Sequence, residues 1–124
     1  MPPISLIENL SRFIFNKKHI RNNNKGHWRA FDPPKNLRMS VYRTSDIIEE
    51  EIWNIGKNVA VSRSKTLKGR VDIAVSNVKA NRLDVVPDDA PSIHANIVDW
   101  PARKEERMEI AMKLADASSG HRKE

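Results

Sequence analysis

The chain has no cysteine, so it cannot build a disulfide framework, a thiolate nucleophile or a metal site with thiolate ligands. It also lacks a glycine-rich phosphate loop, a serine nucleophile elbow and two histidines at the His-x-x-x-His spacing of metal sites. The sequence therefore gives no support to the enzyme classes that such motifs identify. No metal and no cofactor are expected.

A long hydrophobic run is missing as well. The most apolar segment near the N-terminus, residues 4–15, is interrupted by Glu8, Asn9, Ser11 and Arg12, and is shorter than the roughly 20 apolar residues of a membrane span. It has neither the preceding charged stretch nor the small-residue cleavage site of a signal peptide. We therefore expect a soluble, cytoplasmic protein without a membrane partner, and the lack of cysteine suits such a reducing compartment.

Acidic residues are scarce in the N-terminal third of the chain. Residues 1–43 carry nine Lys and Arg but only two acidic side chains, a net charge of +7, whereas the remaining residues have a net charge of −1. No acidic residue occurs from Ser11 through Ala30, and the asparagine run at 22–24 breaks any regular pattern. These features predict a basic loop or arm over residues 16–30.

The basic arm has aromatic residues at its ends, a composition typical of segments that contact phosphates and stack on bases. The same charge would also attract an acidic protein partner, and a plain solvated connection is a third interpretation. The candidate nucleic-acid-binding residues are Lys17, Lys18, Arg21, Lys25, Trp28 and Arg29.

The length of 124 residues and the hydrophobic content of 39% predict a single domain over residues 1–124. Ser5 and Glu8 stand at capping-box spacing before apolar residues that recur with helical periodicity, which predicts a first helix. Residues 118–124 are expected to be a frayed tail. Periodicity elsewhere predicts helices and strands in the following ranges: helices 5–15, 47–60 and 102–117, and strands 37–42, 70–75, 83–86 and 93–98. This order is typical of an α+β fold with a small, mainly antiparallel sheet covered by about three helices.

Two of the predicted strands place polar residues on one face by their period-two alternation. Arg70 and Asp72 share a face of one strand, and His94 and Asn96 share a face of another. A histidine oriented by an aspartate, with cations nearby, is sufficient for phosphoester chemistry. The catalytic candidates are therefore His94 and Asp72, and the substrate-binding candidates are Arg43, Arg70, Asn96 and Trp100. The alternative is that these residues form structural ion pairs and hydrogen bonds.

Four segments carry a resemblance: LRMSVYR at 37–43, EEIWNIG at 50–56, LKGRVDI at 67–73 and HANIVDWP at 94–101. Together and in this order they resemble a family of small, uncharacterised bacterial proteins. The resemblance covers roughly residues 28–117 and implies no activity. The chain departs from the family pattern at Asp99, where glycine is usual, and at Asn81-Arg82, where a glycine tends to precede the leucine.

Two functions from different classes follow from these observations. The first is a binding or accessory module whose basic N-terminal segment engages nucleic acid or an acidic protein partner. The second is a small metal-independent enzyme that acts on a phosphate-bearing substrate through His94 and its polar neighbours. The first function would be sensitive to salt and the second to pH.

Overall fold

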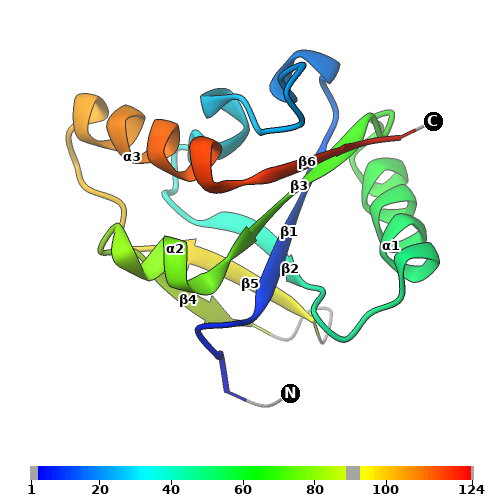
Figure 1. Cartoon of the computed structure of the whole chain (residues 1–124), viewed down its shortest axis with the longest axis horizontal. Coiled ribbons are helices and arrows are strands. Elements are labelled where there is room, and N and C mark those ends of the chain that lie inside the picture. The colour runs from blue at the N-terminus through cyan, green and yellow to red at the C-terminus, as the bar shows by residue number, and fades with distance from the viewer. Residues whose placement is uncertain (1–2, 89–92, 124) are drawn as a thin grey trace.

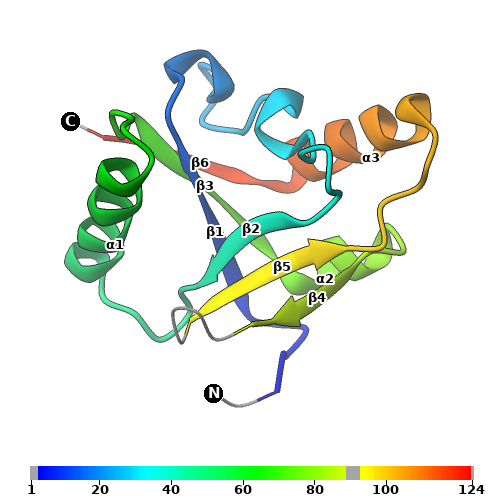
Figure 2. The ribbon, with the colours of Figure 1, turned by 180° about the vertical axis from the view of Figure 1, so that it is seen from behind.

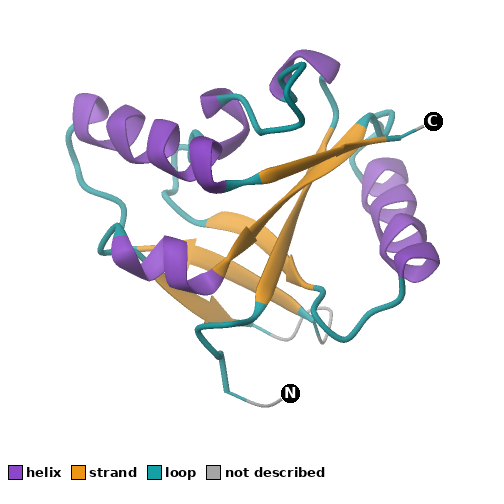
Figure 3. Cartoon of the chain, in the orientation of Figure 1, coloured by secondary structure: helices purple, strands orange, loops and turns teal. Residues whose placement is uncertain are grey.

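A single six-stranded sheet runs through the molecule in the order β4-β5-β2-β1-β3-β6, and each strand is antiparallel to its neighbours (Figure 1). The computed structural model describes residues 3–88 and 93–123. Three helices and two 3-10 turns, η1 and η2, accompany the sheet (Figure 3). The fold is α+β, as the element order predicts. The strands are β1 (Asn9–Ile14), β2 (Met39–Arg43), β3 (Gly69–Ala74), β4 (Asp84–Pro87), β5 (His94–Val98) and β6 (Ser119–Arg122), and the other elements are η1 (Lys17–His19), η2 (Trp28–Phe31), α1 (Glu49–Ser62), α2 (Val75–Ala80) and α3 (Lys104–Ala117).

The prediction of a helix over residues 5–15 is wrong, because this segment supplies β1, a central strand of the sheet. Ser5 and Glu8 form a tight turn instead of a helix cap: the Glu8 N–H donates to the Ser5 carbonyl, and the Ser5 N–H donates to the Glu8 carboxylate. Both faces of β1 are covered, so Leu10 and Phe13 are buried on opposite faces. A strand that is apolar on both faces loses its period-two pattern and imitates helical spacing.

The expectation of a frayed tail from residue 118 is also wrong for Ser119–Arg122, which pair with β3 at four positions. Ser118 is buried and accepts a hydrogen bond from the Gly26 N–H at 2.8 Å. The polar sequence of this segment gave no strand signal, because β6 lies at an edge of the sheet and only Gly120 of its residues is buried.

Two apolar clusters pack on opposite faces of the sheet. The larger one joins strand residues such as Met39 and Ile97 to Leu114 of α3. The smaller one contains Phe13 and Tyr42 of the sheet and Ile52 of α1. Figure 1 accordingly shows α1 apart from α2 and α3. No helix in the described part of the chain is both long and apolar enough to cross a membrane.

The sheet opens between β1 and β2, which pair at only two positions, whereas β1 and β3 pair at six. Figure 2 shows the two strands diverging. The guanidinium of Arg12 bridges this gap: Nε donates to the Ala30 carbonyl at 2.7 Å, and Nη1 donates to the Ser40 carbonyl at 2.9 Å. Arg12 therefore replaces strand pairing with side-chain hydrogen bonds, and it does so next to the basic arm.

Candidate anion-binding site

A cleft of about 600 Å³ lies beside the open end of β1 and is lined by cations from three parts of the chain. Arg12 comes from β1, and the loop after α1 contributes two lysines and an arginine. Among the residues that the structure describes, none of the six Lys and Arg side chains in the cleft forms an ion pair with a carboxylate. We name this site the basic cleft, with the titratable members Arg12, Lys17, His19, Arg29, Arg63, Lys65 and Lys68.

The electrostatics of the basic cleft disfavour further positive charge. Burial and the nearby charge of Arg63 lower the pKa of Arg12 to about 10. Burial also lowers the pKa of His19, as do the positive charges of His27, Arg29 and Arg12. Both shifts have the sign expected where like charges gather and water is partly excluded. An anion in the cleft would remove this repulsion.

The six predicted nucleic-acid-binding residues have three different placements. Lys17 and Arg29 line the basic cleft, and Lys18 joins Arg29 around a smaller adjoining hollow of about 370 Å³. The Arg29 guanidinium stacks over the Trp28 ring at 4.8 Å, while the half-buried indole packs against the larger core cluster.

Arg21 and Lys25 instead fasten the arm to the end of α3. Arg21 Nη2 lies 3.0 Å from the carboxylate of Asp116, and Lys25 Nζ donates to the Asp116 carbonyl at 2.8 Å. Ile20 is buried and its backbone bridges to that of Gly26, so residues 16–30 form an ordered loop packed on the domain. Of the two alternatives that the sequence left open for this segment, a loop or an arm, the arrangement is a loop.

The predicted polar face exists, but its residues form two separate groups. Asp72 pairs with Ser11, Ser11 with Tyr42, and Tyr42 with His94, which places these four side chains in one row across four strands. Three strand spacings, roughly 14 Å, separate Asp72 from His94. Asp72 therefore does not orient His94, and the predicted joining of these residues into one site is wrong.

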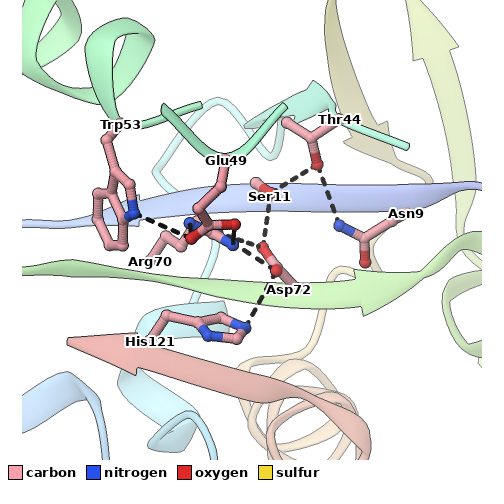
Figure 4. Close-up of polar contacts among 8 residues, drawn as sticks. All are labelled: Asn9, Ser11, Thr44, Glu49, Trp53, Arg70, Asp72 and His121. Carbon is pink, nitrogen blue, oxygen red and sulfur yellow. Dashed lines mark hydrogen bonds and ion pairs between the residues drawn. The ribbon is translucent and has the colours of Figure 1, made fainter. Parts of the chain in front are cut away.

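Arg70 and Asp72 belong to a chain of polar contacts beneath α1 (Figure 4). The Arg70 guanidinium lies 2.7 Å from the Glu49 carboxylate and stacks over the Trp53 ring at 4.8 Å. The hydrogen bond from Arg70 lowers the pKa of Glu49. His121 Nε2 lies 3.3 Å from Asp72. These contacts tie α1 to β3 and β6 and leave Arg70 with a structural role.

His94 has different partners on adjacent elements. Its Nε2 lies 2.5 Å from Ser40 Oγ, and its Nδ1 lies 2.6 Å from Asp88 Oδ1. The predicted neighbour Asn96 donates from Nδ2 to Asp88 Oδ2 at 3.1 Å. Asp88 thus occupies the position that the sequence assigned to Asp72.

The other two substrate-binding candidates are buried scaffold residues. Arg43 is 3% exposed and pairs with Glu8, and Trp100 is 6% exposed and donates from Nε1 to the Ile97 carbonyl at 3.1 Å. Neither lies on the face that carries His94.

Sequence reasoning missed Arg12, Arg63, Lys65 and Lys68 of the basic cleft, and Ser40 and Asp88 beside His94. The basic composition of residues 62–69 was a usable signal for the three loop cations. Ser40 and Asp88 required the β2–β5 register, which the sequence did not supply.

Comparisons with protein-family models, with curated proteins and with solved structures find no match. Within residues 3–88 and 93–123, no three or more His, Asp or Glu side chains are grouped so that they could hold a metal ion. Function therefore has to be argued from the two polar sites themselves.

Proposed function

We propose that the protein is a nucleic-acid-binding module that holds a phosphate backbone in the basic cleft. The observation that carries this proposal is the convergence of six Lys and Arg side chains, unpaired with carboxylates in the described part of the chain, around one hollow. Such a concentration of like charge destabilises the folded protein by repulsion. A bound ligand of opposite charge would offset that repulsion. Neutralising phosphates and releasing their counterions is the main source of nonspecific nucleic-acid affinity.

The shape of the site favours phosphate over an acidic protein surface. The cations surround a concave space that continues into the adjoining hollow beside Lys18, so successive phosphates of one strand have successive cations to contact. Arg29 lines both hollows, is stacked on Trp28, and offers a planar cation to a base or a phosphate. Arg12 is fixed by two backbone carbonyls and provides a rigid floor.

The test is the salt dependence of oligonucleotide binding. Fluorescence anisotropy with mixed-sequence single-stranded RNA and DNA should show affinity that falls steeply as salt rises. Changing Lys17, Lys65 and Lys68 together to Gln should reduce the slope of log K against log salt by roughly 0.7 for each lost phosphate contact, or about 2 in total. All three side chains are exposed, so the thermal midpoint should stay near that of the unmodified protein.

The matched control changes Lys35, Lys104 and Lys113 to Gln. These lysines are also exposed and lie outside the basic cleft, and replacing them removes the same net charge. The control should keep the original slope. An equal reduction of the slope in the two triple variants would contradict the proposal, because binding would then depend on net charge alone. Polyglutamate that competes as well as an oligonucleotide of equal charge would contradict it in favour of an acidic protein partner.

A further inference from the structure

Ser40, His94 and Asp88 are linked in series. Ser40 Oγ lies 2.5 Å from His94 Nε2, and His94 Nδ1 lies 2.6 Å from Asp88 Oδ1. Nucleophile, base and orienting carboxylate are the parts of an activated serine, and they are recognised by geometry, whatever their order in the chain. We propose that this cluster is a catalytic site in which Ser40 attacks phosphodiesters.

The β2–β5 register builds the cluster. Ser40 is paired with Asn96 and Tyr42 with His94, so Ser40 and His94 are diagonal neighbours on one face of adjacent strands. The edge of the His94 ring packs against Tyr42 with the centroids 5.2 Å apart. Asn96, which is 7% exposed, donates to the second oxygen of Asp88. Imidazole and carboxylate are thus both held by neighbouring side chains.

The hydrogen-bond directions suit base catalysis. An ionised carboxylate can only accept, so Asp88 places the proton of a neutral His94 on Nδ1. Nε2 is then the free acceptor that faces the Ser40 hydroxyl. The chain contains an internal contrast in Ser11, whose hydroxyl bonds to Asp72 at 2.6 Å and to Thr44 at 2.7 Å and, in the described part of the chain, to no imidazole. Ser11 is fully buried, whereas Ser40 and His94 are both half-buried.

The position of Ser40 beside the basic cleft indicates the substrate class. The Arg12 guanidinium that lines the cleft donates to the main-chain carbonyl of Ser40. Ser40 does not itself line the cleft, but its main chain contacts the Arg12 guanidinium, so a polynucleotide that fills the cleft and continues past Arg12 would reach the serine. This choice of substrate rests on the proposed function, while the activation of Ser40 does not.

The reaction balances with water as the only co-reactant. Ser40 Oγ forms a bond to phosphorus as His94 Nε2 takes the hydroxyl proton; the bond from phosphorus to one ester oxygen breaks, and His94 returns the proton to that leaving oxygen. Water then attacks the phosphoserine ester, gives its proton through His94 to Ser40 Oγ, and releases a phosphomonoester. The net change is a phosphodiester and water to a phosphomonoester and an alcohol.

A fluorophosphonate probe tests the activation of Ser40 directly, because it is uncharged and reacts far faster with activated serines than with ordinary hydroxyl groups. Mass spectrometry of the labelled, folded protein should place the adduct on Ser40. His94→Gln should slow labelling by about 10²–10⁴-fold, the usual contribution of a general base. Ser45→Ala is the matched control: Ser45 is exposed and its Oγ accepts from the Asn9 N–H, so labelling should be unchanged.

Asp88 acts through His94 and is a positioning residue, so its test is the pH profile of labelling. Asp88→Asn should shift that profile, while Ser45→Ala leaves it in place. Hydrolysis of bis(4-nitrophenyl) phosphate should be lost in Ser40→Ala.

Three outcomes would overturn the proposal. Labelling of the folded protein at Ser40 no faster than in urea would remove the activated serine, and an undiminished rate in His94→Gln would remove the base. Turnover of 4-nitrophenyl acetate without the phosphodiester would remove the substrate class. Failure of the proposed function is separable, since the Lys17, Lys65 and Lys68 variant would then keep its oligonucleotide affinity while fluorophosphonate labelling persists.

Discussion

At the scale of single residues, Arg43 and Glu8 form a buried ion pair outside the two polar sites. Glu8 is 8% exposed and Arg43 3% exposed, and two guanidinium nitrogens contact the two carboxylate oxygens. Burial raises the pKa of Glu8, but the hydrogen bonds from Arg43 and from the Ser5 N–H outweigh it and lower the pKa below its ordinary value. The pair fixes the turn at residues 5–8 to β2.

Glu8→Gln should therefore lower the free energy of unfolding at pH 7 by about 3–5 kcal/mol, because it leaves Arg43 buried without its counter-charge. The pKa of Glu8 is lower in the folded protein than the ordinary 4.5. The pair's contribution is thus complete above pH 4.5 and is lost as the pH falls through the lower folded value. Urea unfolding at several pH values should show the deficit of the variant shrinking below pH 4.5.

The exposed Glu50 provides the comparison, since Glu50→Gln should change stability by less than about 0.5 kcal/mol at every pH. A deficit of Glu8→Gln that stays constant down to pH 2 would show that the carboxylate charge contributes nothing.

At the scale of elements, five described residues other than glycine adopt a left-handed backbone, and two of them lie in connections that adjoin β4 and β5. Arg82, between α2 and β4, has φ 63°, and Asp99, after β5, has φ 70°. Both lie in the left-handed region, where a residue other than glycine costs roughly 1–2 kcal/mol. Glycine adopts this region at no steric cost, so it would relieve the strain at either position.

Arg82→Gly should raise the free energy of unfolding by about 0.5–1 kcal/mol, the relief of the left-handed strain less the extra entropy of glycine in the unfolded chain. The control is Arg103→Gly before α3, where φ is −81° and no gain is expected. Thermal unfolding of both variants measures the difference. An equal or lower midpoint for Arg82→Gly would show that the arginine side chain stabilises the turn by other contacts.

The elements that the sequence predicted carry most of their apolar side chains on one face, even where the other face is also buried. Strands β2 to β5 and helices α1 and α3 all keep a readable period, so Arg70 and Asp72, and His94 and Asn96, were correctly placed in pairs on strands. β1 is buried on both faces and β6 is almost fully exposed, so the spacing of apolar residues identifies neither segment as a strand. The hydrogen-bond partners of His94 could not be predicted from the sequence, because they depend on the register between strands that are distant in the chain.

At the scale of the whole molecule, residues 118–122 near the C-terminus pack against the basic arm of residues 16–30. The Gly120 N–H donates to the Asn24 carbonyl at 2.6 Å, and Arg122 Nη2 donates to the Ile20 carbonyl at 2.6 Å. Together with the bond from Gly26 to Ser118, these contacts hold the loop against the sheet edge. Held in this way, the loop contributes Lys17 and His19 to the basic cleft. The other cations of the cleft come mainly from β1 and from the loop after α1. The basic cleft is therefore a product of the closed fold and not of the basic segment alone.

A chain that ends at Ala117 should accordingly lose β6 and release the loop. Four hydrogen bonds between the loop and residues 118–122 disappear, at about 1 kcal/mol each, so the free energy of unfolding should fall by about 4 kcal/mol or more. Hydrogen exchange should show faster exchange of the amides of residues 20–26, while the amides of β1, which keep β3 as a partner, stay protected. Oligonucleotide affinity should fall as well, because Lys17 and His19 lose their fixed positions in the basic cleft. A chain that ends at Lys123 keeps all four bonds, as well as the bond from the Lys123 N–H to the Lys68 carbonyl, and should match the full-length protein in each measurement. Unchanged protection of residues 20–26 after removal of 118–124 would contradict this account and assign the order of the loop to the contacts of Arg21 and Lys25 with Asp116.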